Sequence, residues 1–269
     1  MRVMKKILYW ILAIVITIVL SIYQRMTGPT HPKSVMVELN GESYKIKLPR
    51  SGVRSDEIVK LKGIPADAKA QLHYHKFPTH EDYTTVDFQW KDNEWQAALP
   101  VQPIAGKLQY FITINGKDYL ADDQPVIRFR NDVPASILVP HILFMFAAML
   151  FAVYTLLLVM TNKEYSRWLW TTIITLFIGG FIFGPLVQHY AFGPWWTGFP
   201  YGTDLTDNKT LLSFLCFAAA VATLKWRYNK WVVGLAVLLM IAIFSIPHST
   251  FGSEYDYTTQ QLGTEKVKR

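Results

Sequence analysis

The residues of this 269-residue chain best suited to chemistry are three histidines beside long apolar segments, His141, His189 and His248. If these segments cross a membrane, as argued below, the three ends lie on one side of it. Met145 follows His141 by four residues and shares its face of a helix. Because imidazole and thioether groups ligate haem iron and Cu(I), these four side chains are candidate ligands for haem b or copper.

A structural alternative stays open for all four side chains. Methionines at helical spacing usually pack in a core, and half-wet histidines are common at membrane interfaces. The chain has no CxxCH or HExxH motif, no Ser-His-Asp grouping and no phosphate-binding glycine loop. Its single cysteine, Cys216, excludes an intrachain disulfide and a CxxC redox pair. We therefore do not expect an enzyme.

A second histidine pair lies in a segment whose residues alternate between apolar and polar. His73 and His75 are two residues apart and would point to the same face of a strand. Such a pair is a candidate surface site for copper or zinc. The alternative is that both rings are simply solvated.

An aromatic loop over residues 189–210, HYAFGPWWTGFPYGTDLTDNKT, separates two of the apolar segments. Trp195 and Trp196 would seat it at headgroup depth, and Thr206 or Asp207 would cap the helix that follows. In a functional alternative the loop is a lid over a pocket for a quinone, haem or a partner helix. Asp204 and Asp207 would then add metal ligands or orient a ligating histidine.

Five apolar segments must position these residues, and most are long enough to span a bilayer. They are Ile7–Tyr23, Ala135–Met160, Trp168–Val187, Leu211–Leu224 and Trp231–Pro247. The fourth is short, so it must extend through Asn208 or Trp226, or thin the bilayer locally. We expect residues 1–25 to be an uncleaved signal anchor, with a cleaved signal peptide as the alternative. Residues 134–250 would form a four-helix membrane domain, followed by a polar tail over 251–269.

The basic residues orient these segments. The net charge is +7, yet residues 26–133 hold 14 Lys/Arg and 14 Asp/Glu, so the excess flanks the apolar segments. Lys and Arg accumulate on the cytoplasmic side of membrane proteins. The pattern predicts a bacterial inner-membrane protein with a cytoplasmic N-terminus, and a periplasmic β domain and C-terminus. It does not favour nucleic-acid binding.

Residues 26–133 predict an extracytoplasmic all-β domain. Seven to nine short alternating segments fill this region, with turn signals at Asn40-Gly41, Asp92-Asn93 and Asn115-Gly116. This density of strands is typical of an immunoglobulin-like sandwich, although the Cys–Trp–Cys signature is absent. A small open barrel is the alternative.

The segments PVIRFRNDVPASILVPHILFMF and FGPLVQHYAFGPWWTGFPYGTDLTDNKT resemble those of an uncharacterised family of bacterial membrane proteins. The resemblance covers the C-terminal half and implies no activity or site residues. An anchor joined to a periplasmic β domain is also similar to accessory proteins of respiratory oxidases. We expect an accessory protein that binds the lipid bilayer and a membrane complex, respiratory or metal-handling, or a periplasmic partner. The alternative is a haem- or copper-binding redox protein.

Overall fold

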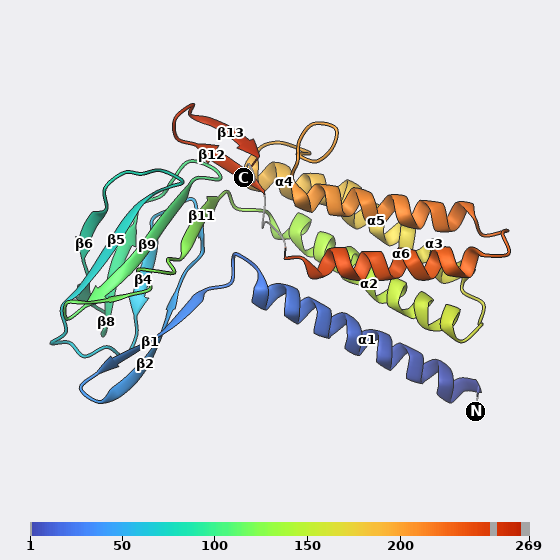
Figure 1. The fold of residues 1–269 in the computed structure, drawn as a ribbon, viewed down its shortest axis with the longest axis horizontal. Helices are drawn as coiled ribbons and strands as arrows, with labels where there is room; N and C mark the ends of the chain where they lie inside the picture. Colours follow the sequence, from blue (N-terminus) through green and yellow to red (C-terminus); the bar gives the residue numbers. More distant parts are fainter. Residues whose placement is uncertain (1, 248–251, 265–269) are drawn as a thin grey trace. The chain divides into compact units, whose positions relative to one another are not determined.

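The computed structural model describes residues 2–247 and 252–264. These residues form two compact units, which are described separately. Residues 2–28 and 133–247 belong to a helical unit, whereas residues 29–132 and 253–264 belong to a β unit (Figure 1). The sequence predicted this mixed architecture of membrane helices and a β domain.

The helical unit holds four helical stretches that are long and apolar enough to cross a membrane, Met4–Thr27, Ala135–Met160, Ser166–Phe192 and Leu205–Ala222. A further apolar helix, Asn229–Ser245, has 17 residues and is about 26 Å long. The helices are α1 (Arg2–Thr27), α2 (Ala135–Met160), α3 (Ser166–Phe177), α4 (Gly184–Phe192), α5 (Leu205–Ala222) and α6 (Asn229–Ser245). A π-helical stretch, η1 (Ile178–Phe183), joins α3 to α4 without a break.

Helix α5 begins at Leu205, six residues before the apolar run that predicted it. The predicted N-caps, Thr206 and Asp207, are wrong, because the cap is Asp204, whose carboxylate accepts the backbone N–H of Thr206 at 2.8 Å. Capping at Asp204 brings five polar residues into the first two turns. The helix thereby gains the length that the apolar run lacks.

The β unit contains thirteen strands in four sheets, among the residues that the structure describes. The largest sheet has the order β3-β11-β9-β5-β6, with β10 paired to β9. Its strands are β3 (Ser51–Val53), β5 (Ala70–Phe77), β6 (Thr84–Asp87), β9 (Lys107–Ile114), β10 (Lys117–Tyr119) and β11 (Val126–Arg130). Two further sheets are β4-β8-β7, from Glu57–Leu61, Glu94–Leu99 and Gln89–Lys91, and the hairpin β1-β2, from Lys33–Leu39 and Glu42–Leu48.

One apolar core holds these sheets together. Leu72 and Ile112 from the large sheet, Val59 and Leu99 from β4 and β8, and Ile46 from β2 are all buried in it. On β9, residues 108, 110, 112 and 114 alternate inward, as their spacing predicts. Most pairs are antiparallel, but β11 and β3 are parallel.

The three turn signals are confirmed. Asn40-Gly41, Asp92-Asn93 and Asn115-Gly116 each join two antiparallel strands and have positive φ at both residues, as tight hairpin turns require. Residues 84–90 alternate as a single strand would, but they form two strands, β6 and β7, that belong to different sheets. They separate at Phe88, which is buried and donates its N–H to Ala70.

The end of the chain differs from the polar tail predicted over 251–269. Strands β12 (Ser253–Asp256) and β13 (Gln261–Thr264) form a hairpin that belongs to the β unit. The Glu254 carboxylate lies 3.2 Å from the Lys107 ammonium, and both side chains are largely buried. The Tyr257 hydroxyl accepts the backbone N–H of Lys107 at 3.0 Å. The β unit is therefore built from two segments that are distant in sequence.

Candidate functional site

His141 lies in α2 and contacts the π-helical stretch. Its Nδ1 is 2.9 Å from the carbonyl oxygen of Gly179, which also accepts the N–H of Gly184. The wider turn accommodates Pro185, which has no N–H to donate and would clash with the preceding turn of an α-helix. Because a carbonyl can only accept, Nδ1 carries the proton in this contact.

Met145, one turn after His141, packs where α2 approaches the same stretch most closely. A Cβ built on Gly179 would lie 2.9 Å from the Met145 sulfur and 3.1 Å from its backbone nitrogen. On the other side, a Cβ on Gly180 would clash with Cγ2 of Thr210 in α5. The glycine pair thus lets two helices pack closely against η1, as small residues do in membrane proteins.

His189 lies in the last turn of α4 and supports the aromatic loop. Its Nδ1 hydrogen-bonds the carbonyl oxygen of Gly193, and its ring stacks on Trp195 with centroids 4.1 Å apart. Gly193 has a φ of 98°, which favours glycine, and it terminates the helix. These contacts give His189 a positioning role in the loop.

The loop is shorter than predicted, because residues 189–192 belong to α4 and residues 205–210 to α5. Its remaining residues, 193–204, are tied to α5 by two side chains in the first turns of that helix. Asp207 accepts the backbone N–H groups of Thr197 at 2.6 Å and Gly198 at 3.1 Å. Asn208 accepts the N–H of Phe199 at 2.7 Å. Asp207 is thus an acceptor for loop amides, and Asp204 is a helix cap.

Trp196 fixes the middle of the loop. Its ring stacks against Phe181 of η1 at 5.6 Å between centroids, and its Nε1–H donates to the Phe199 carbonyl at 3.1 Å. The loop is therefore folded onto the helices by its own aromatic and carboxylate side chains. These contacts favour the structural interpretation of the loop.

Lys209 is a buried residue that the sequence did not single out. Its side chain, in the first turns of α5, is only 4% exposed. The ammonium donates to the carbonyl oxygens of Ile246 at 2.6 Å and Pro247 at 3.1 Å, just beyond α6. It thereby satisfies carbonyl groups at the end of that helix. The sequence signal that could have revealed Lys209 is its position early in a helix, where the helix dipole disfavours a cation.

The haem or copper hypothesis stays a prediction. Within residues 2–247 and 252–264, no three His, Cys, Asp or Glu side chains gather as a metal site would require. His248 lies outside the described residues, so the predicted set of three histidines is incomplete there. A visible-region spectrum and metal analysis of the purified protein test this hypothesis directly.

His73 and His75 both lie on β5, but their rings make different contacts. Both ring nitrogens of His73 are 2.9 Å from threonine hydroxyls, those of Thr85 and Thr113 on the adjacent strands. The ring of His75 contacts Tyr83 edge-on, with centroids 4.7 Å apart. Since His73 is engaged through both nitrogens, it would have to give up a hydrogen bond to bind a metal ion.

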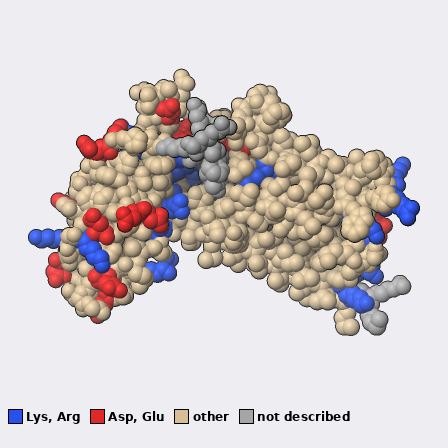
Figure 2. Space-filling view, in the orientation of Figure 1, with Lys and Arg blue, Asp and Glu red and all other residues tan. Residues whose placement is uncertain are grey.

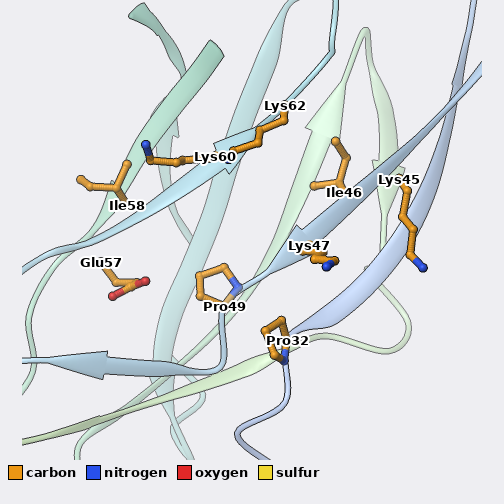
Figure 3. Close-up of a pocket in the computed structure, with 9 residues that line it drawn as sticks. All are labelled: Pro32, Lys45, Ile46, Lys47, Pro49, Glu57, Ile58, Lys60 and Lys62. Carbon is orange, nitrogen blue, oxygen red and sulfur yellow. The ribbon is translucent and has the colours of Figure 1, made fainter. Parts of the chain in front are cut away.

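A groove of about 460 Å³ runs between β2 and β4 on the β unit (Figure 3). Each strand has a ladder on one side only, β2 with β1 and β4 with β8, so their facing edges are not bonded to each other in the described part of the chain. Four lysines line the groove, Lys45 and Lys47 from β2, with Lys60 and Lys62 on the opposite side. Ile58, Pro32 and Pro49 add apolar surface.

The electrostatics of the groove are predominantly positive. The Lys60 ammonium is 2.5 Å from the Glu94 carboxylate, and this bond lowers the pKa of Glu94. Glu57 is the acid among the residues that line the groove, and burial raises the pKa of its carboxyl group. One lining acid thus faces four lysines, of which Lys60 is already paired with Glu94. The groove was not predicted, because β2 and β4 are brought together by tertiary structure alone.

Comparison with protein-family models, curated proteins and solved structures finds no match to this chain. Its function is therefore argued from the geometry of the two units.

Proposed function

We propose that this protein is a non-enzymatic interaction protein of the bacterial inner membrane. Its immunoglobulin-like β domain would lie outside the cytoplasm and bind an extended, acidic segment of a protein partner. Its helices would anchor the domain beside a membrane complex, respiratory or metal-handling. The observation that carries the proposal is the lysine-lined groove between β2 and β4.

The chemistry of the groove suits a segment of this kind. Extended peptides bind along exposed strand edges, where backbone groups give affinity and alternate side chains give specificity. Lys45 and Lys47 are two apart on β2 and both are exposed, so they lie on one face. Acidic side chains on alternate residues of a partner would meet them on this face.

The C-terminal hairpin supports the topology in this proposal. Residues 29–132 and 253–264 belong to one β unit, so both segments must be on the same side of the membrane. The chain between them must therefore cross the bilayer an even number of times. Three long helical stretches lie in this interval, and α6 supplies the fourth crossing. With α1 as the first span and basic loops inside, the β unit faces the periplasm.

A labelled octapeptide of alternating Glu and Val tests the groove. Fluorescence anisotropy would measure its binding to the full-length protein in detergent at low salt. We expect saturable binding by the natural protein, and loss of at least about tenfold in affinity on Lys45→Glu/Lys47→Glu, since two attractive charges become repulsive. Glu57→Gln should tighten binding, because it removes a like charge.

The matched control is Lys69→Glu/Lys91→Glu, which makes the same charge change at exposed lysines of the β unit outside the groove. This variant should keep near-natural affinity. If both double variants lost the same affinity for the peptide, the effect would be due to net charge alone, and this result would contradict the proposal. So would absence of binding by the natural protein. A peptide of alternating Lys and Val should not bind.

A further inference from the structure

A second cavity, of about 670 Å³, lies in the helical unit between α1 and the junction of α2 with α3. Its basic residues are Lys5 and Lys6 from α1, Lys163 from the α2–α3 loop, and Arg167 from α3. This end of the unit carries a concentration of Lys and Arg side chains (Figure 2). None of these four cations forms an ion pair with another described residue.

Aromatic rings form the apolar side of the cavity. Trp10 of α1 stacks on Tyr154 of α2 with centroids 4.1 Å apart, and both rings meet Trp168 of α3 edge-on at 5.0 Å. The Arg167 guanidinium lies 5.3 Å from the centre of the Trp168 ring. These rings pack α1, α2 and α3 against one another, so the cations around them lie on helices that are fixed relative to each other.

The cavity also contains one acid, Glu164, and it already has a structural role. One of its carboxylate oxygens accepts the backbone N–H of Ser166 at 3.0 Å, at the start of α3. The cavity therefore has four cations against one hydrogen-bonded carboxylate.

We infer that this cavity binds a phosphate ester anion, the headgroup of an anionic glycerophospholipid. Phosphate oxygens accept hydrogen bonds from lysine and arginine, and arginine can bind them in a two-pronged geometry. Basic pockets between membrane helices on the cytoplasmic side are suited to such headgroups. Tryptophan and tyrosine sit at headgroup depth, with apolar rings toward the acyl chains. The inference is independent of the groove on the β unit.

Native mass spectrometry of the full-length protein tests the inference. The protein would be exchanged into detergent with phosphatidylglycerol or with phosphatidylcholine at the same concentration. We expect a one-to-one adduct with phosphatidylglycerol only. Lys163→Gln/Arg167→Gln should weaken it by about tenfold or more, because two of the four cations are lost. Circular dichroism and monodisperse elution would confirm that the variant is folded.

The matched control is Lys225→Gln/Arg227→Gln, which removes two cations from the α5–α6 connection, outside the cavity. This variant should keep the adduct. Equal weakening by both double variants, or no adduct with the natural protein, would overturn the inference. Glycerol phosphate at millimolar concentration separates two sources of the anion. Displacement of the lipid would show that the site accepts a soluble phosphate ester as well, whereas retention would show that the acyl chains are required.

Discussion

Lys209 lies early in α5, where the helix dipole disfavours a cation, and yet its side chain is almost completely buried. Its two hydrogen bonds to the carbonyl groups beyond α6 account for this position, because a buried ammonium must be paired. Asp207 has a comparable role for the amides of the aromatic loop. At the scale of the residue, these two polar side chains stabilise a helix end and a loop of the helical unit.

Lys209→Met keeps the length of the side chain but removes the ammonium group. The Ile246 and Pro247 carbonyls would lose their donor, and we expect a cost of about 1.5–3 kcal/mol in the free energy of unfolding. Thermal unfolding of the detergent-purified protein would measure it. Lys225→Met, at the opposite end of α5, is the control and should change stability little. A Lys209→Met protein as stable as the control would contradict this role.

The sequence revealed some of the residues that have a structural role, but it did not reveal the partners of these residues. His141, His189 and the tryptophans stand out by residue type, but their partners are backbone carbonyls and rings that spacing does not reveal. Lys209 has its partners 37 and 38 residues away. A hairpin turn can be predicted because adjacent residues determine it, whereas these contacts depend on how the helices pack.

At the scale of the element, η1 packs closely against two helices through residues that have no side chain. Gly179 faces α2 and Gly180 faces α5, and the extra residue in the turn accommodates Pro185. The sequence showed the Gly-Gly and Gly-Pro pairs as interruptions of an apolar run. It did not show that the helix continues through them with a wider turn, since that depends on the neighbouring helices.

Gly179→Ala adds one methyl group at the closest approach of η1 to α2. The new Cβ would lie 3.1 Å from the backbone nitrogen of Met145, which cannot rotate away, so we expect a loss of about 1–3 kcal/mol. Gly234→Ala in α6 is the matched control, because its Cβ would meet nothing within 4 Å. Chemical unfolding of both variants would measure the difference. Equal stability of the two would contradict close packing at Gly179.

The hairpin β12-β13 is held to the β unit by Tyr257, whose hydroxyl lies 3.1 Å from Gln102 and 3.0 Å from both polar backbone atoms of Lys107. Tyr257→Phe would leave the buried N–H of Lys107 without its acceptor, at a cost of about 1–3 kcal/mol. Hydrogen exchange of residues 253–264 would report the loosening. Tyr255→Phe is the control within the same hairpin.

The same contact has a pH dependence. Burial raises the pKa of Tyr257 to about 12 from its ordinary value of 10.0. The folded hairpin therefore holds the phenol proton more tightly than the unfolded one does. Its stabilising effect is complete below pH 10 and is lost as the pH rises toward 12. Amide protection of the hairpin should fall across this window in the natural protein. In Tyr257→Phe this component should be absent.

At the scale of the whole molecule, the strands were predicted far better than the sheets they form. Alternation and turn dipeptides located most strands and three hairpins, because both signals are local. The separation of β6 from β7, the parallel pair β3-β11 and the return of residues 253–264 to the β unit were not predicted. The groove between β2 and β4 and the cavity beside α1 were also missed, since each is formed by segments distant in sequence.

The proposed topology predicts which residues a membrane-impermeant maleimide reaches. In a Cys216→Ser background, single cysteines would replace the exposed residues Lys91, Lys163 and Thr259. In spheroplasts, cysteines at positions 91 and 259 should be labelled, and a cysteine at position 163 only after permeabilisation. Labelling of positions 91 and 259 from opposite sides would contradict an even number of crossings between them.

The hairpin at the end of the chain also sets an order of assembly. During synthesis the ribosome delivers residues 29–132 first, but Glu254 and Tyr257, the partners of Lys107, emerge only after α6. In the proposed topology the domain would stay incomplete, with the surface around Lys107 uncovered, until α6 has crossed the membrane. The hairpin could then dock only in a correctly inserted protein. If α6 failed to cross, this surface would remain open to proteases on the periplasmic side.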